Sequence, residues 1–302
     1  MKSRSQSHVL ASLLGAAALL IGADAGYAQN PPPPDHPSVT VGGQTYTPRS
    51  ILSRNMGTPE DQTSQFPPHK IIGNIYYVGT RTLTSFLIVT PQGNIIVNST
   101  YERNVPVIQK SVEQLGFKFS DVKILLGNHA HGDHQEGDAL VKQLTGAQVM
   151  AMAEDVPALQ AMKPGGKAHP IDRVLHDAEQ VTLGGTTLVA HLTSGHTRGC
   201  TTWTMKVEEA GKTYDVMFGC SLRAPEKPTP QNVDEFNRSF ALVRTLPCDV
   251  QLGDHGAQYN MQAKYAKLQS GGPNPFIDPD TCKLEAEISE AMVRAILAEQ
   301  QR

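Results

Sequence analysis

The sequence has little of what nucleic-acid-binding and membrane proteins need. Charged residues make up 18% of its 302 residues and the formal net charge is −3, so no strongly basic surface is available for nucleic acid or an anionic membrane. Aromatic residues make up only 6%, with one tryptophan. Beyond the first 28 residues, no apolar run approaches the roughly 20 residues that span a bilayer. We therefore expect a globular monomer that binds neither nucleic acid nor membrane and acts on a small molecule.

The first 28 residues have the pattern of an export signal. Lys2 and Arg4 precede an apolar run that ends at Gly22, and small residues follow up to Ala28, as at an A-x-A-like cleavage site. The apolar run is too short for a membrane anchor. We expect cleavage after Ala28 and a periplasmic location for the mature chain.

Four cysteines lie in the mature part, an even number that favours disulfides in an oxidising compartment. The segments GCTTWTMKV and TYDVMFGC predict a hairpin around the turn EEAGK, centred near residue 210. Cys200 and Cys220 are each ten residues from that centre, so we expect them to lie opposite one another. Cys248 is then left to pair with Cys282. The argument leaves open a different pairing, or one unbonded pair.

Hairpins and helices alternate along the chain. SFLIVT and NIIVNST flank a PQG turn, residues 105–115 have helical spacing, and VKILLGN is typical of a buried strand. Apolar residues at helical spacing return in the last segment, CKLEAEISEAMVRAILAEQ. This order suits an α/β fold with two stacked mixed sheets and helices outside, the αββα sandwich. We expect one domain, 29–302, with a proline-rich arm at 29–45.

The segment GNHAHGDHQEG holds four residues that bind metal ions. His129 and His131 are two apart, so in an extended segment both face the same ion. A turn at Gly132 can aim Asp133 and His134 at a second ion. Imidazole and carboxylate ligands at this density suit zinc. The alternative is a solvated surface cluster, which four ligand-type residues within six at a strand end make a poor explanation.

Two later histidines complete the set. His196 lies in TSGHTRG and His255 in LGDHG, and each follows a predicted strand. Alone, each would more often be structural. Together with the first cluster they give six ligands, enough for two zinc ions with three ligands each and open positions for water.

HxHxDH, followed by GHT and a later GDH, resembles the metallo-β-lactamase superfamily, and His134 directly after Asp133 is similar to subclass B3. The resemblance implies a zinc-dependent β-lactamase that contributes to antibiotic resistance, in which a metal-bound hydroxide attacks the lactam and Asp133 orients it. It also implies that the first zinc is held by His129, His131 and His196 and the second by Asp133, His134 and His255.

The segment MFGCSLRAP separates branches of the superfamily. Glyoxalase II and lactone hydrolases carry a bridging Asp here, and this chain has no carboxylate. We expect Ser221 to face the site and, with Arg223, to bind the substrate carboxylate, although resembling enzymes often have serine in place of Arg223. A shift of the alignment by one residue would put Cys220 at a ligand position, an option that a bond to Cys200 removes.

Three other interpretations remain. In the first, the chain is another dizinc hydrolase of the same fold, such as a lactonase or esterase, since fold does not fix function. In the second, it is a zinc-binding protein without catalysis, although such sites usually close with four ligands. In the third, only one of the two metal positions is occupied by zinc. We expect His69, His169, His176 and His191 to serve structure or solvent contact, and the loop near residues 155–170 to border the cleft.

Overall fold

The computed structural model describes residues 34–225 and 227–301. The predicted signal segment, 1–28, and the start of the proline-rich arm, 29–33, lie outside the described residues. All described residues belong to one structural unit, Pro33–Arg302. Within the described ranges, no helix is both long and apolar enough to cross a membrane.

Seven strands form the first sheet, antiparallel from β3 to β6 and parallel from β6 to β9. The predicted hairpin is present, with Phe86 opposite Val97. The parallel strands need connections that cross one face, and helices provide them. The strands are β3 (His69–Ile72), β4 (Ile75–Tyr77), β5 (Phe86–Thr90), β6 (Gly93–Val97), β7 (Val122–Leu126), β8 (Gln148–Met152) and β9 (Arg173–Leu175).

Five strands form the second sheet, antiparallel except for the parallel pair β13 and β14. They are β10 (Gln180–Leu183), β11 (Thr186–Leu192), β12 (Thr201–Glu209), β13 (Lys212–Gly219) and β14 (Val250–Gly253).

The centre of the β12–β13 hairpin lies half a residue from the predicted position. Its turn residues, Ala210 and Gly211, both have positive φ, as a two-residue type I′ turn requires. Glu209 therefore pairs with Lys212, and the hairpin centre lies between residues 210 and 211. Continued in this register, the ladder places Cys220 opposite residue 201, one residue from the expected partner. The bond to Cys200 forms nevertheless, just beyond the strand ends, as does the bond between Cys248 and Cys282.

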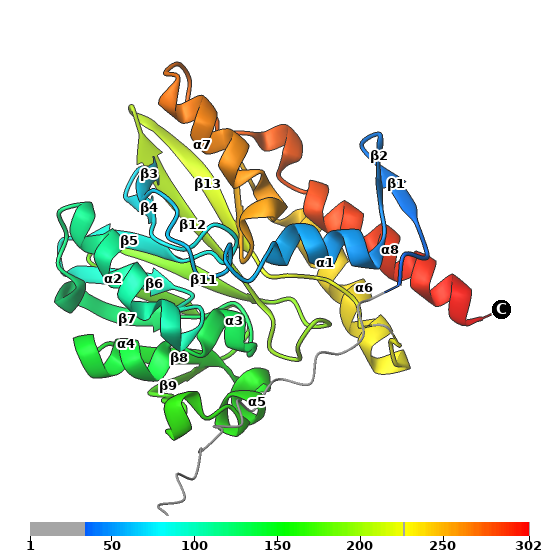
Figure 1. Cartoon of the computed structure of the whole chain (residues 1–302), viewed down its shortest axis with the longest axis horizontal. Helices are drawn as coiled ribbons and strands as arrows, with labels where there is room; N and C mark the ends of the chain where they lie inside the picture. Colours follow the sequence, from blue (N-terminus) through cyan, green and yellow to red (C-terminus); the bar gives the residue numbers. More distant parts are fainter. Residues whose placement is uncertain (1–33, 226, 302) are drawn as a thin grey trace, which may run out of the picture. The chain divides into compact units, whose positions relative to one another are not determined.

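Helices cover both outer faces of the two sheets (Figure 1). The α-helices of the described residues are α1 (Pro48–Met56), α2 (Val105–Gln114), α3 (Gly132–Gln135), α4 (Asp138–Thr145), α5 (Val156–Ala161), α6 (Pro230–Thr245), α7 (Met261–Gln269) and α8 (Leu284–Gln300). Short 3-10 turns lie at Glu102–Asn104, Phe119–Asp121, Ala153–Asp155, Pro164–Gly166, Gly256–Tyr259 and Pro279–Thr281.

Three apolar layers account for the packing. The largest lies between the sheets and includes Trp203 and Phe86. A second, with Val112 and Val141, packs α2 and α4 on the first sheet. A third packs α1, α6 and α8 around Met217 on the outer face of the second sheet. The predicted αββα sandwich is confirmed, and both sheets are mixed as expected.

The segment predicted as a proline-rich arm contains regular structure. Residues 39–46 form a hairpin of β1 (Val39–Val41) and β2 (Gln44–Tyr46), whose Tyr46 is buried in the layer with α8. Helix α1 follows at once, because Thr47 caps it in a capping box with Ser50 and proline stands at its first position. The end of the arm, 39–45, therefore belongs to the folded domain.

Candidate metal centre

The site lies where strands of both sheets end. Strands β6, β7 and β8 run parallel in the first sheet, and β11, β13 and β14 share one direction in the second. The carboxyl ends of aligned strands meet at one edge, the usual place for a site in α/β folds. The chain leaves β7 at His129, β11 before His196 and β14 before His255. The predicted ligands, spread over 127 positions of sequence, thus come together at this edge.

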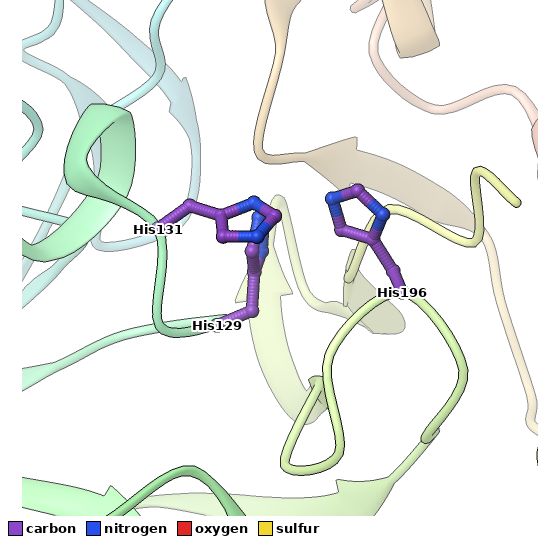
Figure 2. A group of neighbouring side chains, drawn as sticks. All are labelled: His129, His131 and His196. Atoms are coloured by element: carbon purple, nitrogen blue, oxygen red, sulfur yellow. The ribbon is translucent and has the colours of Figure 1, made fainter. Parts of the chain in front are cut away.

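Three histidines form the first group. The ligand atoms of His129, His131 and His196 lie within 4.8 Å of one another. Figure 2 shows His131 and His196 approaching from opposite sides, with His129 rising from below on the His131 side. The ring centroids are 4.7 to 4.8 Å apart. This is the set that the sequence assigned to the first zinc.

Asp133, His134 and His255 form the second group, again with ligand atoms within 4.8 Å of one another. Asp133 Oδ2 lies 3.2 Å from His134 Nε2 and 3.8 Å from His255 Nε2. Helix α3 begins at Gly132, where the sequence predicted a turn, and it carries Asp133 and His134. The rings of His129 and His134 are 4.3 Å apart, which joins the two groups.

Burial favours neutral imidazoles in most of the cluster. It lowers the pKa of His129 to about 3 and that of His255 to about 4, and the charge of neighbouring His134 adds to both effects. Burial also lowers the pKa of His196 well below its ordinary value. Burial would raise the pKa of Asp133, but His134 and His255 hold it well below 3.8. Neutral imidazole and ionised carboxylate are the forms that bind a metal.

The donor set fits zinc. Within the described part of the chain, His129 Nε2, both ring nitrogens of His134 and His255 Nδ1 are buried without a hydrogen-bond partner. Buried polar atoms are rarely left unpaired, and each such atom calls for an explanation. Imidazole nitrogens and a carboxylate facing a shared space at this density match zinc coordination. Metal ions at this cluster would supply a partner for His129 Nε2 and for one ring nitrogen of His134.

The remaining nitrogens of two first-group ligands point to oxygen acceptors. His196 Nδ1 lies 2.9 Å from the carbonyl oxygen of Arg223, and His129 Nδ1 lies 3.2 Å from Asp254 Oδ2. A carbonyl or an ionised carboxylate can only accept, so Nδ1 carries the proton in both rings and Nε2 keeps its lone pair. These contacts select the tautomer that a metal needs.

Asp155 was missed by the sequence reasoning. Its buried carboxylate accepts from Ala130 N at 2.8 Å, Gly199 N at 2.7 Å and Thr197 Oγ1 at 2.9 Å. Ala130 lies between two ligands and Thr197 follows another, so this carboxylate holds both loops of the first group. A Cβ at Gly199 would lie 2.5 Å from the Asp155 nitrogen, so only glycine allows this approach. The acid stands in EDVPAL, which gives no metal-site signal.

Asn128, directly before His129, was also missed. Its side chain donates to the carbonyls of residue 201 at 2.9 Å and residue 218 at 3.3 Å in the second sheet. On the other side, Asn98 donates to Asn128 Oδ1 at 2.8 Å and accepts from its backbone nitrogen at 2.9 Å. Asn98 has φ of 67°, a strained conformation of the kind found near functional sites. The amide pair links the two sheets at the base of the histidine cluster.

Ser221 lies beside the cluster, but its hydroxyl is engaged by protein groups. It is buried, and its hydroxyl donates to Asp254 Oδ1 at 2.9 Å while accepting from Gln258 Nε2 at 2.8 Å. A hydroxyl has one proton to donate, so Ser221 offers none to a substrate in this arrangement. Cys220 is bonded to Cys200, which removes it as a metal ligand.

Arg223 remains at the cluster. Burial lowers the pKa of His131, and the positive charge of Arg223 contributes to that lowering. The same residue lines a pocket of about 300 Å³ with Ile51, Met292 and Ile296. The charge of Arg223 thus acts on the histidines, and the residue also lines a partly apolar pocket in which none of the six predicted ligands takes part.

The four histidines that were expected to serve structure or solvent contact lie outside the two groups. His69 stacks on Tyr77, His191 Nε2 lies 2.8 Å from Thr204 Oγ1, and His176 is exposed. His169 is buried beside Asp138.

Solved structures of bacterial proteins are similar to this chain in sequence and in fold. The native FEZ-1 metallo-β-lactamase from Legionella gormanii is 43% identical, with a TM-score of 0.76, over 79% of this chain and 98% of that one. BJP-1, a subclass B3 metallo-β-lactamase of Bradyrhizobium japonicum, is 37% identical, with a TM-score of 0.74, over 80% and 97%.

A hydroxyacylglutathione hydrolase from Methylobacterium sp. (strain 4-46) is 26% identical over 183 residues, which are 60% of this chain and 63% of that protein. No protein-family model matches the sequence. The two bacterial β-lactamases instead align over nearly their whole length. The chain belongs to the metallo-β-lactamase family and resembles its subclass B3 members.

Proposed function

We propose that this protein is an exported β-lactamase that uses two zinc ions to hydrolyse the lactam amide and so contributes to antibiotic resistance. The observation that carries the proposal is the convergence of all six predicted ligands into two adjoining groups of three. Three protein ligands per ion leave positions open for water and substrate, as in catalytic zinc sites. A periplasmic location and action as a monomer belong to the same proposal.

His129, His131 and His196 would hold one ion, and Asp133, His134 and His255 the other. When bound, zinc polarises the substrate carbonyl and lowers the pKa of water to about 7. The protein's own part is to keep imidazole lone pairs directed inward, through the acceptors at His129 and His196. Asp133, ionised and beside both His134 and His255, is placed to accept a hydrogen bond from the attacking water.

Arg223 is the proposed anchor for the substrate carboxylate. A guanidinium binds a carboxylate through two parallel hydrogen bonds. The pocket of about 300 Å³ that Arg223 lines together with Ile51 and Met292 would receive an apolar substituent of the substrate. Ser221, whose proton is already donated to Asp254, is not part of this anchor.

A second candidate is hydrolysis of a thioester or lactone. The similarity to a hydroxyacylglutathione hydrolase supports it, although the match spans only 63% of that protein. Against it, the residue after the β13 strand end is a bonded cysteine where such hydrolases carry a carboxylate.

The test is hydrolysis of a penicillin, a cephalosporin, a carbapenem, a lactone and a glutathione thioester by the purified mature protein. Each assay is run with added zinc and with a chelator. We expect lactam turnover that chelation abolishes and zinc restores. His176→Ala, at an exposed histidine away from the cluster, is the matched control and should behave as the parent. Full zinc occupancy with turnover of the thioester or lactone alone would overturn the lactamase proposal.

A further inference from the structure

Asp254 is a buried carboxyl group beside the two ligand groups that belongs to neither of them as predicted. It follows β14, directly before His255, and its exposed fraction is 0%. A buried charge is costly unless several donors compensate it. Asp254 has three: Ser221 N at 2.9 Å, Ser221 Oγ at 2.9 Å and His129 Nδ1 at 3.2 Å.

The contact with His129 controls a metal ligand. Because the carboxylate accepts from Nδ1, the His129 ring presents its unprotonated Nε2, which has no hydrogen-bond partner among the described residues. A carboxylate behind a histidine in this way fixes ring orientation and raises the basicity of the ligand. Asp254 also lies within 4.8 Å of the His134 ligand atom. Its two oxygens already accept hydrogen bonds, which suits holding a ligand.

The contacts with Ser221 hold the other strand end. Both the backbone N–H and the hydroxyl of Ser221 donate to Asp254, and Gln258 donates to the same hydroxyl. Gln258 packs tightly here, since a Cβ at Gly253 would lie 2.3 Å from its Oε1. One side chain thereby joins the ends of β13 and β14 in the second sheet to the loop after β7 in the first.

We propose that Asp254 is the positioning residue of this metal centre: it orients His129 toward the first metal and keeps the Ser221 hydroxyl from the substrate. The proposal rests on metal binding at the cluster. It also gives a physical reason why Arg223, rather than Ser221, is left to meet the anionic end of a substrate. No carboxylate follows β13 in this chain, but Asp254, which follows the neighbouring strand β14, places one beside the cluster.

The test measures zinc affinity by competition with a chromophoric chelator, together with bound zinc per chain, for the parent, Asp254→Asn and Asp254→Ala. Removing such a supporting carboxylate lowers metal affinity about 10–100-fold in general. We expect about tenfold for Asp254→Asn, which keeps an acceptor oxygen, and up to about 100-fold for Asp254→Ala. Circular dichroism and melting of the metal-free forms show which variants fold, and Asp254→Asn suffices if Asp254→Ala does not.

Ser221→Ala is the matched variant, because it removes the hydroxyl but keeps the backbone N–H and the His129 contact. Its zinc affinity should stay within about twofold of the parent, since the supporting contact to the ligand remains. Equal affinity of Asp254→Asn and the parent, or an equal loss in Ser221→Ala, would overturn the role of Asp254 alone. A parent that binds no zinc would instead overturn the proposed function.

Discussion

The two ligand groups of the metal centre differ in what holds them. In the first, His129 and His196 each have one nitrogen bonded to a fixed acceptor, and Asp155 ties their two loops together. In the second, His134 Nδ1 has no hydrogen-bond partner in the described ranges, and His134 Nε2 contacts only Asp133 Oδ2, at 3.2 Å. The members of the second group lie mainly against one another, through Asp133.

This difference indicates which ligand group is already ordered before a metal ion binds. Side chains whose orientation is already fixed lose little conformational entropy when they bind a metal, whereas loosely held ones must be ordered at that moment. We therefore expect the first group to bind its zinc more tightly and the second group to depend on Asp133 and on the ion itself.

The largest effect is expected from Asp133→Ala. The change removes the carboxylate that contacts both histidines of the second group, so the second zinc should be lost. A catalytic metal contributes several kcal/mol of transition-state stabilisation, which corresponds to a loss of kcat/KM of about 1000-fold. Steady-state kinetics and zinc per chain measure it, with one zinc retained. Near-native turnover would contradict the dizinc mechanism.

Asp155→Ala should weaken the first group. Three donors lose their acceptor, and leaving buried donors unsatisfied costs about 1–3 kcal/mol of unfolding free energy. Affinity for the tighter zinc should also fall about tenfold, because the loops of His129 and His196 lose their shared support. Denaturant unfolding and chelator titration measure the two effects. An unchanged zinc affinity in a destabilised protein would mean that Asp155 supports only the fold.

Stepwise removal of metal tests the contrast without mutation. During dialysis against increasing chelator, we expect one zinc to leave at least about tenfold earlier in free-zinc concentration than the other, a difference of about 1.4 kcal/mol. Native mass spectrometry counts the ions, and the Asp133→Ala protein identifies which position is retained. Simultaneous loss of both ions would show that the two groups are equally held.

The smallest effect concerns His169, which supports the helix of the second group. Its Nε2 lies 3.2 Å from Asp138 Oδ2 and from the carbonyl oxygen of Gln135, which ends α3. Burial lowers the pKa of His169, but Asp138 outweighs it and the pKa is raised above 6.5. The stabilisation is therefore fully present below about pH 6.5 and lost as pH rises through the folded value.

In denaturant unfolding between pH 5.5 and 9, the parent should lose stability above pH 6.5 relative to His169→Gln, which cannot titrate there. The difference should be a shallow slope, smaller than the effect of Asp155→Ala. Parallel pH profiles for the two proteins would show that His169 does not carry the charge.

Much of this protein follows from local sequence. Residues of the HAHGDH segment lie next to one another in the chain, and their spacing around the turn at Gly132 predicted the two ligand pairs that the structure places in separate groups. The strands and helices follow from apolar periodicity because each has one face that must be buried. The Cys200–Cys220 bond was predicted from a hairpin centre that was off by half a residue, and the pairing survived because the strands end before the cysteines.

Other features were decided only by the tertiary structure. Asp155, Asn128 and Asp254 stand at the ends of different strands, and nothing in their neighbouring residues shows which loop each would meet. The β1–β2 hairpin within the predicted arm likewise depends on an apolar layer formed with α8, some 240 residues away. A sequence determines ligands that cooperate with their chain neighbours. The residues that support those ligands depend on which strand ends the sandwich brings together, because hydrogen bonds and burial act between atoms close in space, whatever their separation along the chain.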